Sequence, residues 1–188
     1  MNKPILGVIV FLSILFIACE QQKVKRIKYP DGSLKEEYEV TKDEHGQLLR
    51  NGLTKKFHKN GQLHVEVQFI EDKKHGRQRS FNANGKLEYE EFYLHGKLEG
   101  TRKQYFPEEG TVELQVDFKN NQRHGQFIRY RKDGQIHHQM QYVEGLKNGY
   151  HKQFNTDGSL DTLMWFEKGN PVDHPVDTVG ASTASTGN

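Results

Sequence analysis

The sequence is poor in the residues on which most catalytic and metal-binding sites depend. One cysteine among 188 residues excludes an intrachain disulfide framework and a zinc site built from several cysteines. The chain also lacks a G-x-S-x-G nucleophile elbow, a glycine-rich phosphate loop and the H-x-x-x-H spacing of a helical metal site. We therefore expect no enzyme activity, no cofactor, no bound metal and no small-molecule substrate.

An excess of charge of one sign is also lacking. The 27 Lys and Arg residues nearly balance the 25 Asp and Glu residues, which leaves a formal net charge of +2. Nucleic-acid-binding domains carry a pronounced basic footprint, so we expect no nucleic-acid partner. The ten histidines lie mostly at turn or polar positions. His137 and His138 are adjacent, and regular strand alternation would point them to opposite faces, away from a shared metal ion.

Long hydrophobic runs are confined to the N-terminus. Lys3 precedes an uncharged apolar run of 15 residues, 4–18, which is shorter than the roughly 20 residues of a membrane-spanning helix. This pattern is typical of a secretory signal peptide. The run ends in FIAC, residues 16–19, which resembles a bacterial lipobox. We interpret residues 1–18 as a signal peptide and Cys19 as a lipidated membrane anchor. A signal peptide with an unmodified cysteine is the alternative.

What the sequence does contain is repetition. One set of glycines, the turn glycines, has spacings of 24, 25, 24 and 24 residues after its second member: Gly32, Gly61, Gly85, Gly110, Gly134 and Gly158. A second glycine set keeps the same step, and so does a set of aromatic residues: Gly52, Gly76, Gly100, Gly125 and Gly149; Phe57, Phe81, Tyr105, Tyr130 and Phe154. The 29-residue gap after Gly32 indicates a five-residue insertion within 41–50. Within this insertion Asp43 or Glu44, with His45 nearby, is the one place for a catalytic acid that does not recur with the repeat. We expect the insertion to be a loop.

The pattern within each repeat predicts two strands. Asn-Gly or Asp-Gly pairs, such as Asn60-Gly61, would supply the positive φ of a tight hairpin turn. At the second, fourth, sixth and eighth positions after the turn glycine, 20 of 24 residues are apolar. At the third, fifth and seventh positions only three of 18 are: Phe92, Leu163 and Trp165. This period of two indicates strands with one buried face, and nothing comparable supports helix.

Charge separates between the two strands of each repeat. The eight residues after each turn glycine contain ten acids and two bases in total. The six residues after each glycine of the second set contain nine bases and no acid. Cross-strand pairing of these charges would contribute roughly 0.2–1 kcal/mol per pair and gives the basic residues a structural role.

The predicted fold is all-β: an elongated antiparallel meander of about six stacked β-hairpins, over residues 29–170, without significant helix. Six hairpins at about 4.8 Å per strand make a sheet roughly 55–60 Å long. Residues 19–28 would hold the lipidated cysteine and a tether, whose bases could rest on anionic lipid headgroups or be solvated. Residues 171–188 are rich in Pro, Ser, Thr, Gly and Asp and are expected to be a disordered tail.

The recurring aromatic-x-x-x-Gly-x-aliphatic pattern, followed by aromatic-x-x-Gly/Asn/Asp-x-x-x-Gly, resembles the MORN-variant repeat of the YwqK family of bacterial proteins. The resemblance covers about Tyr29 to Asn170. It implies a scaffold or interaction surface, and the family's frequent antitoxin label implies an immunity-type protein as an alternative. A glycan-binding surface is a third alternative, because regularly spaced aromatic rings can stack on sugars.

These observations lead to a hypothesis for function. The chain is expected to be a non-catalytic scaffold that binds a protein partner in the cell envelope. Phe92, Leu163 and Trp165 are the candidate contact residues, since they place large apolar groups on the polar side of the sheet. Glu20, rather than aspartate, follows Cys19, which favours the outer membrane of a Gram-negative bacterium.

Overall fold

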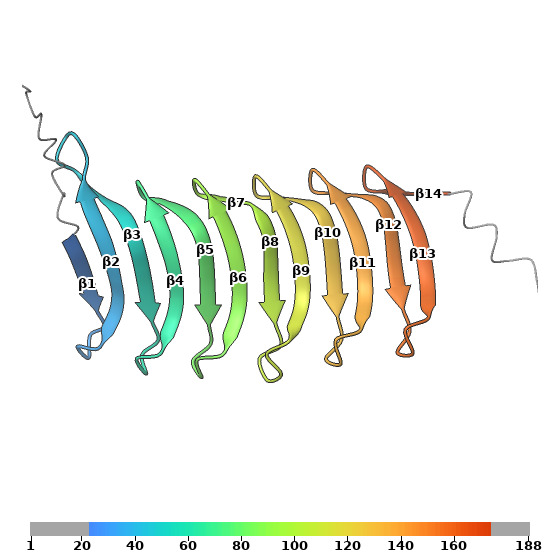
Figure 1. Cartoon of the computed structure of the whole chain (residues 1–188), viewed down its shortest axis with the longest axis horizontal. Coiled ribbons are helices and arrows are strands. Elements are labelled where there is room, and N and C mark those ends of the chain that lie inside the picture. Colours follow the sequence, from blue (N-terminus) through green and yellow to red (C-terminus); the bar gives the residue numbers. More distant parts are fainter. Residues whose placement is uncertain (1–22, 174–188) are drawn as a thin grey trace, which may run out of the picture.

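The computed structural model describes residues 23–173, which form one antiparallel sheet (Figure 1). Its strands are β1 (Lys23–Lys28), β2 (Leu34–Lys42), β3 (Leu48–Phe57), β4 (Leu63–Ile70), β5 (Lys73–Phe81), β6 (Leu87–Leu94), β7 (Lys97–Leu98), β8 (Gly100–Tyr105), β9 (Val112–Lys119), β10 (Gln122–Tyr130), β11 (Ile136–Val143), β12 (Leu146–Phe154), β13 (Leu160–Glu167) and β14 (Asn170–Val172). No helix occurs in this part of the chain. The predicted all-β meander is confirmed.

Each strand pairs with the strand that follows it in sequence, and only β7 lies off the path, paired with β6. The β1 end and the β13 end therefore lie at opposite ends of the row of strands (Figure 1). Twelve steps between strands at about 4.8 Å give a sheet roughly 58 Å long. Apart from β6 and β8, which pair past the two-residue β7, the paired strands are neighbours in sequence, as expected for a repeat protein stabilised by nearest-neighbour contacts.

The six turn glycines form the lower edge of the sheet in Figure 1. In five of these turns the glycine N–H donates to the carbonyl three residues earlier, at 2.9 to 3.1 Å. Gly110 instead donates to Phe106, four residues back, and this longer turn accounts for the single 25-residue spacing. The positive φ lies on the glycine, from 70° to 89°.

The Asn or Asp before the turn glycine has a different role from the one expected. It does not share the positive φ. In four turns its side-chain oxygen instead accepts the backbone N–H of the residue after the glycine, as Asp31 does from Ser33 at 2.9 Å and Asp133 from Gln135 at 2.9 Å. In the Gly85 turn Asn82 accepts this N–H in place of Asn84. Short polar side chains favour turns through such local hydrogen bonds.

The upper edge in Figure 1 contains a second kind of turn. Two consecutive residues have positive φ in five of these turns, as in type I′ hairpins: 71–72, 95–96, 120–121, 144–145 and 168–169. The second residue of each turn donates its N–H to a carbonyl 22 or 23 residues earlier, at 2.7 to 3.0 Å. These bonds connect consecutive repeats outside the strand ladders.

All five glycines of the second set have positive φ, and four of them, Gly52, Gly76, Gly125 and Gly149, lie within strands and mark a β-bulge. Gly100 instead begins β8. A side chain on the neighbouring strand, seven residues after a turn glycine, caps the bulge. Glu39 accepts the N–H of Leu53 at 2.7 Å, and Asp117 accepts that of Gln126 at 2.9 Å. A Cβ added to Gly125 would lie 2.9 Å from the Asp117 carboxylate, so this position requires glycine.

The sheet is a single layer, so few side chains are fully buried. Among the described apolar residues only four are buried: Val40, Val67, Val116 and Tyr142. All four lie on the parity that the sequence predicted to be apolar. Most other residues of that parity are half-buried, because they pack against their neighbours along the sheet and not beneath a second layer.

Two predicted boundaries were wrong. Residues 23–28, assigned to the tether, form β1 and pair with β2. Residues 171–172, assigned to the tail, belong to β14 and pair with β13. The five-residue insertion lengthens the β2–β3 hairpin. The expected signal peptide, Cys19 and the rest of the expected tail lie outside the described residues.

Candidate interaction surface

The two faces of the sheet differ in chemistry. We call the polar face the side that presents the third, fifth and seventh residues after each turn glycine. We call the strand after each turn glycine the first strand of its repeat, and the strand that contains a glycine of the second set the second strand. Cross-strand pairing places parts of the second strands on the polar face too, because Lys55 lies opposite Glu37 and Arg79 lies opposite Glu66. The opposite, apolar face carries the four buried apolar residues.

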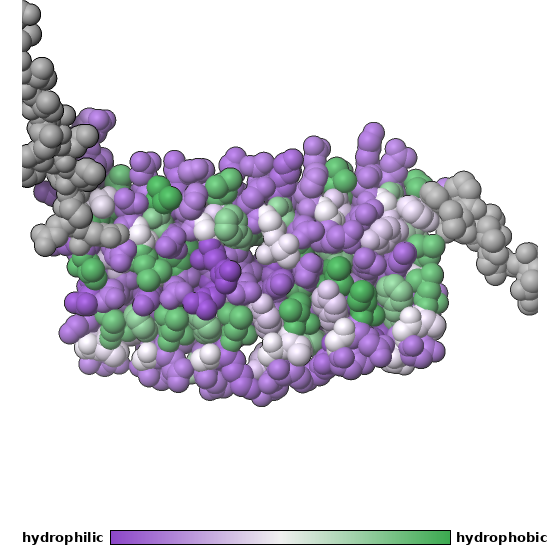
Figure 2. Space-filling view, in the orientation of Figure 1, coloured by the Kyte–Doolittle hydropathy of each residue, from purple (hydrophilic) through white to green (hydrophobic). Residues whose placement is uncertain are grey.

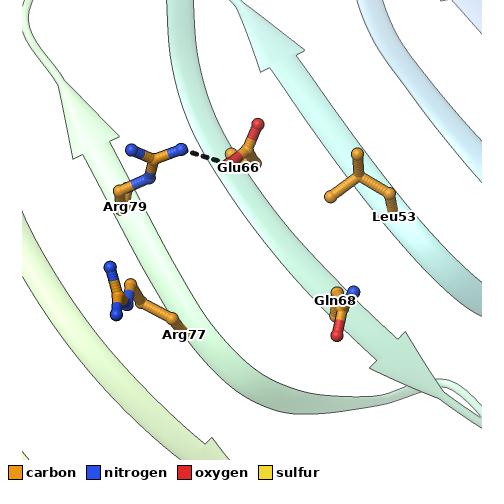
Figure 3. A pocket seen from close by; sticks show the side chains of 5 residues that line it. All are labelled: Leu53, Glu66, Gln68, Arg77 and Arg79. Atoms are coloured by element: carbon orange, nitrogen blue, oxygen red, sulfur yellow. Dashed lines mark hydrogen bonds and ion pairs between the residues drawn. The ribbon is translucent and has the colours of Figure 1, made fainter.

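The polar face is strongly charged from β1 to β6, and its arginines are paired with glutamates. Arg26 lies 2.7 Å from Glu37. A shallow depression of about 350 Å³ lies between β3 and β5 and is lined by Leu53, Glu66, Gln68, Arg77 and Arg79 (Figure 3). Arg79 lies 2.7 Å from Glu66 within it, and Arg77 lies 3.8 Å from Glu90 beside it. The predicted cross-strand charge pairing is therefore confirmed, and each pair contributes about 0–1 kcal/mol.

From β10 to β13 the polar face changes to amide, aliphatic and aromatic side chains. Its members are Gln126, Ile128, His137, Gln139, Gln141, Tyr150, Leu163 and Trp165, with Lys152 and Asp161 as the charged residues among them. Tyr150 donates its hydroxyl hydrogen to Gln126 at 3.1 Å, and the Gln139 amide donates to the same oxygen at 3.3 Å. Hydrogen bonds between side chains therefore order this less charged part of the polar face.

Two of the candidate contact residues meet at its end. Leu163 and Trp165 line a depression of about 340 Å³ together with Met164, Pro171, Val172 and Asp173. The Trp165 ring lies edge-on to Tyr150, with ring centroids 6.4 Å apart. Val172 pairs with Trp165 across β13 and β14. We call this cluster of Leu163, Trp165, Tyr150 and Val172 the terminal patch.

The sequence did not indicate the other members of the terminal patch. Tyr150 falls in a segment where the sequence singled out only the basic residues and Phe154, and Val172 falls in the expected tail. The hydropathy view in Figure 2 shows apolar residues reaching the β13 end of the face that it displays. Met164, Leu160 and Val172 are 38%, 49% and 39% exposed, so this end of the sheet has accessible apolar surface.

Phe92 lies apart from the terminal patch. It is 44% exposed on β6, and six steps between strands, about 29 Å, separate β6 from β13. Phe92 is the seventh residue after its turn glycine, the position at which Glu39 and Asp117 accept a backbone N–H at a bulge in other repeats. The Phe92 side chain has no oxygen or nitrogen that could accept this hydrogen bond. The second strand of this repeat is divided at Glu99 into β7 and β8.

The histidines on β11 and β12 differ from expectation. The His137 and His138 rings lie 3.9 Å apart, because a register shift at this end of β11 interrupts regular alternation. His151 lies 5.9 Å from His138. Burial, and then the neighbouring His137 and His151, lowers the pKa of His138, and burial lowers the pKa of His151. Both shifts favour the neutral form of these half-buried rings.

Other titratable groups also have structural partners. Burial and the Glu91 carboxylate raise the pKa of Tyr93 to about 12, and burial and the Glu90 carboxylate raise the pKa of Tyr105 to about 12. Neither phenol is activated as a nucleophile. In the insertion, Asp43 accepts the backbone N–H groups of His45 and Gln47 at 2.9 and 2.8 Å. Asp43 is thus a turn-forming residue.

Residues 23–173 contain no group of three or more His, Cys, Asp or Glu side chains placed to hold a metal ion. The same residues include no helix of the length and hydrophobicity needed to cross a membrane.

The architecture defines a β-hairpin repeat protein, and comparison with known families refines this class. Residues 50–71 and 74–95 each match the family model described as a MORN repeat variant. These matches cover β3 to β4 and β5 to β6. The remaining hairpins repeat this two-strand arrangement, with a longer turn at Gly110 and a longer β2–β3 hairpin. No curated protein matches the chain.

Proposed function

We propose that the protein is a non-catalytic lipoprotein of the bacterial envelope that docks a protein partner on the terminal patch. The observation that carries this proposal is the departure of Leu163 and Trp165 from the polar pattern, together with their position in one accessible depression beside Val172. Tryptophan is enriched among interface residues whose loss weakens binding most. The proposal anchors the protein through its lipobox-like segment and assigns it to the outer membrane because Glu20, rather than aspartate, follows Cys19.

Rigidity supports a docking role. A sheet tied together by ladders and by hydrogen bonds between repeats presents its surface already ordered. Ordering of loops and side chains is one of the main costs of association, so a preformed surface loses less free energy on binding.

The position of the proposed anchor also supports this role. Cys19 precedes Lys23, the first residue of β1, by four residues. Lipidation of Cys19 would hold the β1 end next to the membrane, whereas the terminal patch lies at the far end of a sheet roughly 58 Å long. The protein would thereby present its docking surface away from the point of attachment.

Trp165→Ala tests this function. The variant should lose most of the partner that co-purifies with the wild-type protein from membranes, because removing a central tryptophan typically costs 2 kcal/mol or more of binding, roughly 30-fold in affinity. Its melting temperature should fall much less than that of a core substitution such as Val116→Asp, since Trp165 is only half-buried at the end of the sheet. Thermal melting and quantitative mass spectrometry of the purified samples measure the two effects.

Phe92→Ala is the matched variant, because Phe92 occupies the same place in its own repeat. Loss of the partner in both variants would mean that the partner contacts the polar face from β13 as far as β6. Loss in Trp165→Ala alone would confine it to the terminal patch. A Trp165→Ala protein that unfolds, or that retains its partner fully, would contradict the proposed site.

A glycan-binding role is a second candidate, favoured by Tyr150 and Trp165 next to the amides of Gln126 and Gln139. Aromatic rings beside amide groups suit stacking and hydrogen bonding to sugars. Recovery of the wild-type protein on envelope polysaccharide, and its loss in Trp165→Ala, would favour this role. An immunity-type function rests only on the resemblance to YwqK proteins.

A further inference from the structure

The row of strands begins and ends with incomplete repeats. Inside the sheet, the first strand of each repeat pairs with its own second strand on one side and with the second strand of the preceding repeat on the other. β1 holds the place of a second strand, because Arg26 pairs with Glu37 as Lys55 pairs with Glu66. No first strand precedes β1 within residues 23–173.

At the opposite end of the row, β13 is a first strand. Within residues 23–173 its own second strand is represented only by the three residues of β14. β14 pairs with Trp165, Phe166 and Glu167. The outer side of residues 160–164 has no ladder partner in the described part of the chain. Unpaired strand edges of this kind are templates for the addition of another strand.

The two open edges are complementary in charge. β1 carries four cations and no acid among its six residues, KVKRIK. The open stretch 160–164 of β13 carries one acid, Asp161, and no cation. Each edge also exposes apolar side chains: Val24 and Ile27 are 44% and 40% exposed, and Leu160 and Met164 are 49% and 38% exposed. Like charges would oppose the pairing of two β1 edges with each other.

We propose that β1 of one copy adds to the open edge of β13 of a second copy, so that the molecules associate head to tail. This inference goes beyond the proposed function, because it uses the strand edges and does not depend on the lipid anchor. β1 and β13 run in opposite directions along the meander, so the junction continues the antiparallel sheet. Main-chain hydrogen bonds would supply the affinity, as in other cases of strand addition.

The internal repeats fix the register of this junction. Lys55 pairs with Glu66 of the next repeat and with Glu37 of its own repeat, the fifth residue after a turn glycine. By the same rule Arg26 lies opposite Leu163, the fifth residue after Gly158. Ile27 then lies opposite Thr162, and Lys28 lies beside Asp161. Because the contact is heterologous and does not close on itself, it produces open chains of molecules.

Disulfide trapping in cells that express the full chain tests the junction. Ile27→Cys combined with Thr162→Cys should give a ladder of dimers, trimers and longer species on a non-reducing gel, since opposed residues on paired strands lie within disulfide reach. The matched control combines Ile27→Cys with Gln153→Cys, because Gln153 lies opposite Thr162 one strand further in. At roughly 10 Å from Ile27 in the assembly, this position cannot be bridged.

Two further samples are run on the same gel. Dimers of the wild-type chain would arise from Cys19, and additional dimers of the Ile27→Cys single variant would arise from the pairing of two β1 edges. Adding Asp161→Lys to the Ile27/Thr162 cysteine pair should shorten the ladder, and adding Lys28→Asp as well should restore it. A missing ladder, an equal ladder in the Gln153 control, or dimers alone in every variant would overturn the proposal.

Discussion

Val116→Asp should destabilise the protein by on the order of 3 kcal/mol or more. Val116 is 4% exposed on the apolar face, between Arg102 on β8 and Phe127 on β10. The change removes about 1.5 kcal/mol or more of apolar burial and adds the cost of desolvating a carboxyl group, about 1–3 kcal/mol. Arg102 cannot easily compensate, because Glu91 already lies 3.3 Å from its guanidinium. Urea unfolding followed by circular dichroism measures the loss.

Gln115→Asp is the matched control. It introduces the same side chain one residue earlier, on the polar face, where Lys103 lies opposite. We expect a change of about 0.5 kcal/mol or less, as for most surface substitutions. Equal losses at residues 115 and 116 would mean that the two faces are not distinct, because a shift of one residue exchanges them.

Cys19→Ser should transfer the protein from the detergent phase to the aqueous phase in a phase-partitioning experiment. The proposed acyl chains on Cys19 would each contribute about 0.8 kcal/mol per buried CH₂ group, and two or more chains are needed for stable anchoring. Without the cysteine no acyl chain is attached. Immunoblotting of both phases measures the transfer.

Gln21→Ser serves as the control for this change, because it replaces a nearby residue with the same side chain and leaves Cys19 in place. This variant should remain in the detergent phase with the wild type. Identical partitioning of Cys19→Ser and wild type would remove the basis for a lipid anchor.

The period-two pattern and the three sets of spaced residues were sufficient to predict the sheet, its strand order and the identity of its buried face. Val40, Val67, Val116 and Tyr142 all lie at predicted apolar positions. The extent of burial could not be predicted in the same way. Alternation tells which side a residue faces, but not whether a second layer covers that side.

β1 was missed because its sequence, KVKRIK, looks like a solvated spacer. Edge strands are often rich in lysine, and this makes them resemble a linker. His137 and His138 were wrongly placed because a register shift breaks strand alternation, and single sequences seldom reveal such shifts.

The terminal patch was predicted in part. Leu163 and Trp165 stood out as apolar residues at polar positions, and the structure brings them together in one depression. Phe92 stood out by the same criterion but lies about 29 Å away. Periodicity identifies the face of a residue, whereas its neighbours across strands depend on pairing register, as the contact of Tyr150 with Trp165 illustrates.

The central claim is that a protein partner docks at the β13 end of the polar face, and site-specific photo-crosslinking in cells tests it most directly. A photoreactive residue at Asp161, next to the terminal patch, is compared with one at Glu88, which occupies the same place three repeats earlier. We predict an adduct with another protein from position 161, absent from position 88 and lost when Trp165→Ala is added. Equal adducts at both positions, or adducts only with further copies of this chain, would contradict the claim.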